Sequence, residues 1–481
     1  MRGNAVAFNT PNFQVLSKDQ IKQIHWATLH VLERTGVRLT HPKAREILHG
    51  AGAHVEGDLV RIPAALVEEA IRSAPSSITL YDRHGQPKIH LEDHRVHFGS
   101  VVDSPFILDP YTRQLRTLVA ADIRLMTLMG DYCPQIDFIS AWGGSASDYP
   151  AAVRDQIAFR MVVRNTTKPF GTNAYDARTL SDLLEMQAIV AGGYENLRQR
   201  PLTYHYSEPT SPLVHTDEAV DKLLLCADAG VPLVYTPMTT AGGTGPATLA
   251  GTLVISNADC LSGLVIHQLY HKGAPFIYGG MPSMMDMRTT VYSFSAPEFT
   301  LMSAAQNEIG HFYQLPVYGT AGASDAKVVD EQAAVEFTLS CFTSALNGAN
   351  LVHDVALIGG CTVVSPEAVL LNDEILTMVD KIMQGIKVDA ETLAEDVIHK
   401  VGPGGHYMGE EHTLKHFRDL WYPRIFDRTR TGIWLEAKGP YVEETLNRRT
   451  REILETHEPE PLPDIVLCQL AEQEKKWLRQ E

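Results

Sequence analysis

The chain has 481 residues, of which 58 are acidic and 41 basic, giving a formal net charge of −17 at pH 7. This balance argues against nucleic-acid binding, because neutralising phosphates requires clustered lysine and arginine. Hydrophobic residues make up 44% of the chain, enough for a large core, which excludes global disorder. At about 150 residues per domain, the length fits three domains or one large barrel with additions.

The cysteines and the N-terminal residues bear on the cellular compartment. Six cysteines form no C-x-x-C pair and are too few to staple a chain of this size. Residues 1–17 lack the apolar run of a signal peptide, so we expect a cytoplasmic location. Residues 229–258 are uncharged, but three prolines there disfavour a membrane helix. We expect a buried strand, a glycine-rich loop and a helix start instead, and no membrane association.

The first hundred residues predict a small α+β cap. Ser17 followed by Gln20 has the pattern of a capping box, which marks the start of a helix. Further helices are predicted to begin near Pro42 and Pro63. Residues 77–98 contain short apolar runs separated by turn residues, which indicates strands. We assign residues 1–115 to this cap.

After about residue 130, short apolar strands alternate with helices. The predicted strands span residues 136–141, 169–172, 202–206, 232–236, 275–278, 316–319 and 350–355. The helices between and after them span residues 151–164, 177–190, 217–228, 249–271, 296–313, 331–346 and 367–386. Many strands begin at a proline that follows a helix-ending glycine. Strands that alternate with helices in this way indicate parallel β/α units.

These strands, with a weak eighth candidate over residues 101–108, predict an α/β fold, a TIM (β/α)8 barrel in residues 116–400. A doubly wound open sheet is the alternative. Residues 401–481 predict a C-terminal loop and a charged helical arm. Such a charged run is typical of a solvated face or of contacts with another subunit, and we expect a homo-oligomer.

The carboxyl ends of the strands are where a β/α barrel carries its active site. His353 and Asp354 follow the last predicted strand, and they are the candidate catalytic pair. One of the two side chains should point toward the barrel mouth, because successive residues of a strand alternate in direction. A loop-capping aspartate beside a satisfied histidine is the alternative interpretation.

Aromatic residues gather at other strand ends. Tyr204, Tyr206 and Tyr278, together with Glu208, are the candidate substrate-binding residues. Several aromatic faces around one cavity suit a quaternary ammonium group, since each ring contributes about 0.5–2 kcal/mol by cation–π attraction. Ordinary packing inside the barrel is the alternative for each tyrosine.

Metal and nucleotide sites are poorly supported. His267 and His271, like His412 and His416, have a spacing that can bind zinc, but neither pair forms an H-E-x-x-H motif. We therefore predict no metal site. The neutral loop at residues 241–246 lacks the P-loop lysine and the dinucleotide-binding spacing. Its glycines leave room for something large to approach the backbone.

Six groups of motifs extend over nearly the whole chain. They are HFG at 97–99 with DPYT at 109–112, GPATLAG at 245–251, SDAK at 324–327, DEQAA at 330–334, GANLVHD at 348–354, and GPGGH at 402–406 with HTLKHFR at 412–418. Together they resemble the trimethylamine:corrinoid methyltransferase (MttB-like) family. The resemblance implies a β/α barrel that moves a methyl group from a methylamine to Co(I) of a corrinoid on a separate small protein.

One departure from the family bears on the substrate. Archaeal trimethylamine members carry pyrrolysine near the segment that corresponds to residues 324–330, where this chain has only ordinary residues, with Lys327 the sole lysine. Pyrrolysine-free relatives are associated with quaternary amines. The resemblance therefore favours glycine betaine, converted to dimethylglycine, as the substrate. Proline betaine, carnitine, γ-butyrobetaine and choline are the alternatives.

The chemistry of a quaternary amine fits a site with few catalytic side chains. Its leaving group is a neutral tertiary amine, so in-line attack needs positioning and desolvation more than proton transfer. Under this interpretation His353 hydrogen-bonds the substrate carboxylate. Cobalamin approaches along the glycines at strand ends and in the neutral loop, namely Gly242, Gly243, Gly245, Gly280 and Gly319.

The cofactor is expected on a second protein. The chain has no D-x-H-x-x-G motif, which corrinoid proteins use to supply a histidine ligand to cobalt. We therefore expect a corrinoid protein as partner, with the cobalamin not tightly bound by this chain. Two other classes stay open: a zinc-dependent corrinoid methyltransferase and a non-catalytic betaine-binding barrel.

Overall fold

The computed structural model describes residues 1, 11–100, 102–142, 144–439 and 441–477. Its centre is an eight-stranded parallel sheet in which each strand pairs with the next in the chain, and the last pairs with the first. A bridge between Tyr278 and Val317 joins the remaining pair. The strands are β6 (His97–Ser100), β9 (Phe138–Ile139), β10 (Phe170–Thr172), β11 (Thr203–Ser207), β13 (Leu233–Tyr235), β15 (Phe276–Tyr278), β17 (Tyr318–Thr320) and β18 (Leu351–Val355).

This closed order confirms the predicted (β/α)8 barrel, and the doubly wound open sheet is wrong. Each of the seven clearly predicted strands overlaps a barrel strand. The weak eighth candidate is corrected: the first barrel strand is β6, which ends before residue 101, and Val101 lies outside the described residues. Strand β7 (Phe106–Leu108) instead belongs to a small separate sheet with β8 (Leu115–Thr117), β19 (Leu357–Ile358) and β20 (Val363–Val364).

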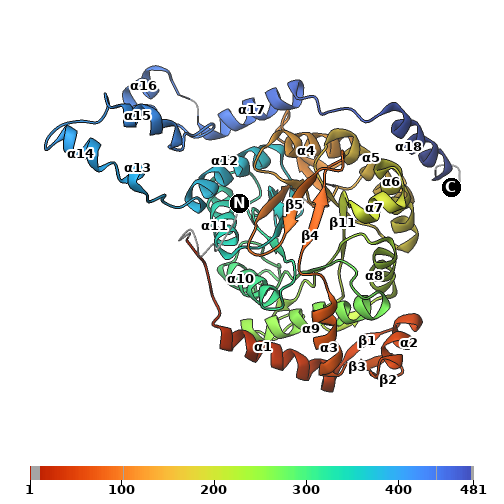
Figure 1. The fold of residues 1–481 in the computed structure, drawn as a ribbon. Coiled ribbons are helices and arrows are strands. Elements are labelled where there is room, and N and C mark those ends of the chain that lie inside the picture. Colours follow the sequence, from red (N-terminus) through yellow and green to blue (C-terminus); the bar gives the residue numbers. More distant parts are fainter. Residues whose placement is uncertain (2–10, 101, 143, 440, 478–481) are drawn as a thin grey trace.

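Helices surround the barrel, as Figure 1 shows in a view along the barrel. Side-chain caps at Asp176, Thr216, Asp330 and Ser365 accept hydrogen bonds from the first turns of four of these helices, which fixes where each begins. The outer helices are α4 (Ala120–Tyr132), α5 (Arg154–Asn165), α6 (Ala177–Ala191), α8 (Asp217–Ala229), α9 (Leu249–Tyr270), α10 (Pro297–Phe312), α11 (Glu331–Asn347) and α12 (Pro366–Met383).

Helix α9 is the helix, among those described, that is long and apolar enough to cross a bilayer. In the structure 72% of its most apolar window is buried, against α1 (Lys18–His30), α3 (Ala64–Ser73) and α8. The uncharged segment 229–258 divides into β13, the short strand β14 (Thr240–Ala241) with its glycine loop, and the start of α9. This is the division that its prolines and glycines predicted.

The N-terminal cap packs on the outside of the helix layer. Ser17 begins α1 with the predicted capping box, and α2 (Pro42–Gly50) and α3 begin at or next to the predicted prolines. The cap sheet contains β1 (Val37–Leu39), β2 (His54–Glu56) and β3 (Leu59–Arg61), and β12 (Val214–His215) from the barrel loops joins it. The cap is thereby tied to α9 and to the β11–α8 loop, away from the barrel interior.

A β-hairpin closes the amino end of the barrel. Strands β4 (Ile78–Tyr81) and β5 (Pro87–Leu91) lie across this end in Figure 1. The Tyr81 N–H donates to the carbonyl of Pro201, just before β11, and the Arg83 N–H donates to that of Thr167, before β10. The apolar face of the hairpin packs on barrel-interior side chains, which are Phe138, Tyr204, Val234, Ile277, Tyr318 and Leu351.

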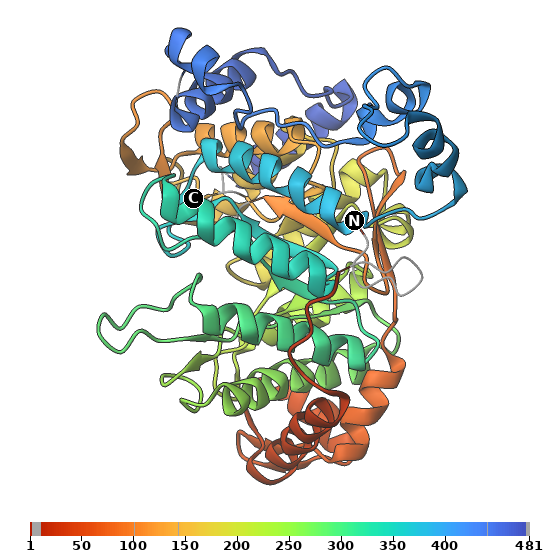
Figure 2. The same ribbon diagram turned by 90° about the vertical axis from the view of Figure 1, so that its left-hand side faces the viewer.

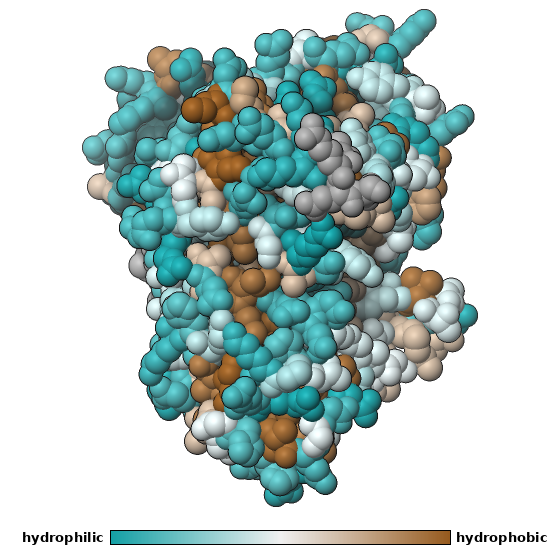
Figure 3. Space-filling view, turned by 90° about the vertical axis from the view of Figure 1, so that its right-hand side faces the viewer, coloured by the Kyte–Doolittle hydropathy of each residue, from teal (hydrophilic) through white to brown (hydrophobic). Residues whose placement is uncertain are grey.

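The C-terminal residues form an arm and a strap. The arm, α13 (Ala390–Leu393) to α16 (Thr431–Glu436), projects beyond the barrel in Figures 1 and 2. The strap returns to the helix layer, where α17 (Val442–Thr456) packs on α4 and α12, and α18 (Asp464–Trp477) on α5 and α6. Figure 3 shows that the face bearing these last helices is mostly hydrophilic, with small apolar patches.

Candidate functional site

A cavity of about 220 Å³ opens at the carboxyl end of the barrel. Each of the eight strands, or the loop that follows it, contributes to its wall, as expected of a barrel active site. The cavity is below the ~300–1,000 Å³ usual for drug-sized ligands, which suits a small molecule. Its lining residues are Val102, Asp103, Ser140, Ala141, Asn173, Tyr206, Glu208, Met238, Met281, Phe294, Tyr318, His353, Asp354 and Cys361.

The cavity has a polar half and an apolar half. Five neighbouring strands, β18, β6, β9, β10 and β11, supply the polar groups. The remaining three, β13, β15 and β17, supply Met238, Met281 and Tyr318, and Phe294 from the loop after β15 completes this side. A ligand is therefore offered hydrogen bonds and charge on one side, and sulfur and aromatic surface on the other.

Both His353 and Asp354 line the cavity, although strand alternation predicted that only one would point toward the barrel mouth. The register between β18 and β6 shifts between Val352 and Val355, so that β18 carries a bulge at this pair. Bulges re-aim side chains, and they often lie beside active sites. Asp354 has φ +74°, in the left-handed region that few residues other than glycine adopt.

The His353–Asp354 pair is held by the surrounding barrel. His353 Nδ1 donates to the carbonyl of Gly319 at 2.7 Å, and its Nε2 lies 3.2 Å from Oδ2 of Asp354. The Tyr318 ring stacks on the imidazole, with ring centres 4.0 Å apart. Burial lowers the pKa of His353 to about 3 and raises that of Asp354 to about 8. The carboxyl group thus keeps its proton near neutral pH and donates it to Nε2.

Asp103 is a site residue that the sequence did not single out. Burial raises its pKa to about 7, with a smaller contribution from Asp155. The Asn173 side chain donates to Oδ2 of Asp103 at 3.3 Å, and Oδ1 has no hydrogen-bond partner among the described residues. Asp103 was missed because the first strand was predicted too late, which placed this residue inside a strand instead of just beyond the end of β6.

The third carboxyl group of the cavity is Glu208. The hydroxyl of Tyr206 donates to its Oε2 at 2.8 Å. Burial raises the pKa of Glu208, and the nearby charge of Lys222 opposes that rise. Lys222 itself is not part of the cavity lining. Two of the predicted binding residues therefore act as a hydrogen-bonded pair on the polar side.

Comparison with known proteins identifies the family. Residues 2–476 match the model of the family described as trimethylamine methyltransferase (MTTB). The chain belongs to this family. It is 34% identical to "Trimethylamine methyltransferase MttB" of Desulfitobacterium hafniense over 94% of this chain and 92% of that protein. It is 29% identical to "Glycine betaine methyltransferase" of another strain of that species, over 95% of each chain.

Solved structures show the same fold. The monomethylamine methyltransferase MtmB of Methanosarcina barkeri superposes with a TM-score of 0.55, over 92% of this chain and 88% of that one. At 11% identity this likeness concerns the fold alone. The MTTB family of methyltransferases thus has here a member with an eight-stranded barrel, and the cavity described above lies where such barrels carry their chemistry.

Two predicted binding tyrosines lie elsewhere in the structure. Tyr204 is fully buried below the cavity, where its hydroxyl donates to the carbonyl of Ser140 at 2.8 Å and its ring packs among barrel-interior side chains. The Tyr278 hydroxyl donates to Oδ1 of Asn257 on α9 and accepts from Gln306 on α10. Tyr278 therefore faces the helix layer, and the structure places neither tyrosine in the cavity lining.

The glycines predicted to face cobalamin divide into two groups. Gly242 and Gly243 are exposed, and a Cβ on either would meet nothing closer than 3.5 Å. Gly245 lies in the same loop, half-buried against Thr239 and Thr252. A Cβ on Gly280 would instead lie 2.5 Å from Nε2 of Gln306, and one on Gly319 would lie 2.7 Å from Ala349. Gly280 and Gly319 are thus required by close internal packing, which corrects the expectation that they leave space for a cofactor.

The remaining candidates fall outside the cavity. Lys327 is exposed, and its Nζ donates to the carbonyl of Asp325. Within the described residues, no group of three or more His, Cys, Asp or Glu side chains could hold a metal ion. Of the histidine pairs, His267 is buried against Phe276, and His416 binds Glu391 and Asp419 on the exposed arm.

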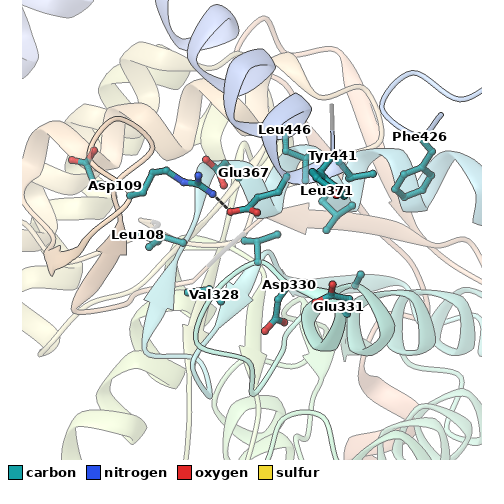
Figure 4. A pocket seen from close by; sticks show the side chains of 15 residues that line it. Leu108, Asp109, Val328, Asp330, Glu331, Glu367, Leu371, Phe426, Tyr441 and Leu446 are labelled. Carbon is teal, nitrogen blue, oxygen red and sulfur yellow. Dashed lines mark ion pairs between the residues drawn. The ribbon is translucent and has the colours of Figure 1, made fainter. Parts of the chain in front are cut away.

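A larger cavity of about 870 Å³ lies outside the barrel and is drawn in Figure 4. It is bounded by β7, by the starts of α11 and α12, and by α17. An ion pair between Arg113 and Glu443 spans it. Its described lining holds no serine, histidine, cysteine or lysine, and it shares no lining residue with the barrel cavity. The barrel cavity is therefore the candidate functional site.

Proposed function

We propose that the chain transfers a methyl group from a quaternary amine to Co(I) of a corrinoid carried by a separate protein. The observation that carries this proposal is the barrel cavity. It combines the carboxyl groups of Asp103, Glu208 and Asp354 with aromatic rings, and its described lining contains no lysine or arginine. A quaternary ammonium has no N–H to donate, so aromatic faces and carboxylates are the groups that can attract it.

The residues of the chain act on the amine. The aromatic and thioether side chains of the apolar half surround the N-methyl groups and exclude water. The fixed positive charge of the amine favours ionisation of the carboxyl groups, and the ionised forms balance that charge. No proton has to be supplied, since the departing tertiary amine is neutral. A corrinoid on the partner protein would supply the nucleophile, Co(I), to which the methyl group would be transferred.

The loops beyond the cavity suit the approach of a large cofactor. The Met238 and Met281 walls lead outward into β14 and β16 (Ser283–Met284), which pair with each other. The loop after β14 carries the uncrowded Gly242 and Gly243, and the loop after β16 exposes Met287. In Figure 2 a green loop from this region protrudes opposite the orange β4–β5 hairpin. We propose that the corrinoid partner docks here, on the open end of the barrel.

Within this class, the sequence resemblance and the relative named glycine betaine methyltransferase make glycine betaine the first compound to test. Proline betaine, carnitine, γ-butyrobetaine and choline follow. All six cysteines are unpaired, which supports the proposal of a reducing, cytoplasmic location. The amine and the corrinoid protein are thus the proposed partners.

The proposed function is tested by adding the chain to Co(I) cobalamin with a panel of quaternary and tertiary amines and following loss of the Co(I) absorbance. Phe294→Leu should lower the rate about five- to thirtyfold, since it removes a ring of the apolar half worth ~1–2 kcal/mol. Tyr278→Phe, outside the cavity, is the control and should retain the wild-type rate. Amine binding without any Co(I) loss would favour a non-catalytic barrel, and one zinc per chain would favour a zinc mechanism.

A further inference from the structure

We infer that the methyl donor is a quaternary ammonium compound that bears a hydroxyl group and no carboxylate, of which choline is the simplest. This inference rests on the proposed function and narrows its substrate. It departs from the sequence-based expectation of glycine betaine, and three features of the cavity carry it: its charges, the hydrogen bonds of His353, and an unpartnered acceptor on Asp103.

The carboxyl groups of the cavity and the lack of a cation in its described lining disfavour a substrate carboxylate. Asp103, Glu208 and Asp354 line the cavity, and no lysine or arginine joins them among the described lining residues. Lys222 interacts with Glu208 and Asp155 from outside the lining. A carboxylate brought into this space would be desolvated beside other carboxyl groups with no cation to pair with, which is costly. A compound with a net positive charge instead meets carboxyl groups whose ionised forms can pair with it.

His353 was the expected partner of a substrate carboxylate, but both of its nitrogens are already engaged. Nδ1 donates to Gly319 and Nε2 faces Asp354, while Tyr318 covers one face of the ring. Donation to a substrate would require breaking the 2.7 Å bond to Gly319 or displacing Asp354. His353 is therefore a positioning residue for Asp354 and Tyr318, and the carboxylate of a betaine is left without a donor there.

The polar half of the cavity instead contains a hydrogen-bond acceptor, on Asp103, that has no donor among the described residues. Oδ1 of Asp103 and Oγ of Ser140 are buried and have no hydrogen-bond partner among the described residues. Both residues line the cavity, and they follow the neighbouring strands β6 and β9. A buried polar group left unpaired costs about 1–3 kcal/mol. A substrate hydroxyl that donates to Asp103 and accepts from Ser140 would satisfy both groups.

The two halves together define one orientation. The hydroxyl arm lies on the side of Asp103 and Ser140, and the trimethylammonium head lies against Met238, Met281, Phe294 and Tyr318. Asp354, on the strand between Tyr318 and Asp103, then neighbours the positive nitrogen. Choline and glycine betaine share this head and differ in the arm, where a hydroxymethyl group replaces a carboxylate, so they form a matched pair for the test.

The test is isothermal calorimetry on the full chain at pH 8 with choline, glycine betaine and tetramethylammonium. Choline should bind at least about tenfold more tightly than either of the others. Asp103→Asn should remove most of the advantage of choline over tetramethylammonium. Asp259→Asn is the control, because Asp259 is also a buried carboxyl group but binds Ser211 and Leu213 away from the cavity.

The outcomes separate this inference from the proposed function. Glycine betaine binding as tightly as choline would overturn the inference and leave the proposed function standing. Equal binding of choline and tetramethylammonium, or an Asp103→Asn variant with an unchanged ratio, would refute the hydroxyl contact. If no amine binds and none consumes Co(I) cobalamin, the proposed function itself falls.

Discussion

Two features of Asp354 are unfavourable for the stability of the fold. Its backbone is in the left-handed region, which costs of order 1–3 kcal/mol for an ordinary residue, and its carboxyl group is buried beside a neutral imidazole. The β18 bulge creates both conditions, because it turns Asp354 toward the cavity next to His353. A permanent cation in the cavity would stabilise the ionised carboxylate. Binding of a quaternary amine should therefore be coupled to the ionisation of Asp354.

The raised pKa of Asp354 predicts how stability varies with pH. Between pH 4 and pH 8 the Asp354 side chain keeps a proton in the folded chain that it releases in the unfolded chain, so the contribution of Asp354 to the free energy of unfolding falls as pH rises and levels off above pH 8. Asn cannot titrate, and it tolerates a positive φ. We expect the stability of Asp354→Asn relative to wild type to be higher at pH 8 than at pH 5 by at least about 1 kcal/mol.

Urea unfolding at the two pH values measures this difference. Asp464→Asn, at an exposed position on α18, is the matched control and should follow the wild type at both values. A difference between Asp354→Asn and wild type that stays constant from pH 5 to pH 8 would show that Asp354 is already ionised in the folded chain.

The sequence led to only part of the site. The rule that barrels react at strand ends selected His353, Asp354, Tyr206 and Glu208, which the structure brings into one cavity. It also selected Tyr278, whose hydroxyl turns to the helices, because alternation along a strand does not say which of its two faces is inside. Asp103 was missed for a related reason, since its position depended on a strand boundary.

The strands that were predicted most accurately are those with a glycine and a proline at their start. A glycine that ends the helix and a proline that starts the strand mark β13 and β15, and both were predicted to within two residues. Strand β6 is not preceded by such a glycine and proline. Of its four residues, only Phe98 has a large apolar side chain. Strand β6 is a strand because it pairs with β18 and β9, and the local sequence pattern does not predict this pairing.

The β4–β5 hairpin is the element whose role is least visible in sequence. Leu80 is fully buried, on the face that packs against the barrel interior, whereas Lys88 on the facing strand is exposed. Leu80→Ala should lower the free energy of unfolding by about 2–5 kcal/mol, because it leaves a cavity at the closed end of the barrel. Lys88→Ala should change it by less than about 0.5 kcal/mol.

Denaturant unfolding measures the free energy of unfolding of these two variants. Calorimetric titration with the amine measures its dissociation constant. Since the hairpin fills the end opposite the cavity, the dissociation constant of the amine should be unchanged in folded Leu80→Ala. Equal stability of the two variants would mean that the hairpin is not part of the cooperative core.

For the whole molecule, the contrast lies between the strap and the arm. The strap is tied down by contacts far apart in the chain, such as His457 with Asp131 and Gln473 with Glu185. The arm and the link that joins it to α12 expose large apolar side chains, including Met408 of the arm at 87% and Ile386 of the link at 89% exposed. Clustered exposed apolar groups are typical of protein–protein contacts. We propose that a second copy of this chain covers the arm.

Substituting the arm tests this assembly. Ile386→Lys combined with Met408→Lys should shift the mass measured by light scattering from that of an oligomer to the 53.2 kDa of one chain. Ile465→Lys, at an exposed apolar position on α18, is the control and should leave the oligomer intact. A wild-type chain that is already a monomer at micromolar concentration would contradict the proposal.

The way in which the cavity wall is shared among the eight strands has a consequence for how such barrels diverge. Each strand end contributes its own side chain, and the helices and hairpin that hold the strands lie outside the wall. A single substitution at one strand end, such as at Asp103 or Ser140, would change the side chain that we propose contacts the hydroxyl substituent of the amine. The loops where we propose that the corrinoid partner docks follow other strands and would stay in place. Donor preference in this architecture can therefore change one position at a time, while the acceptor and the transfer step are inherited unchanged.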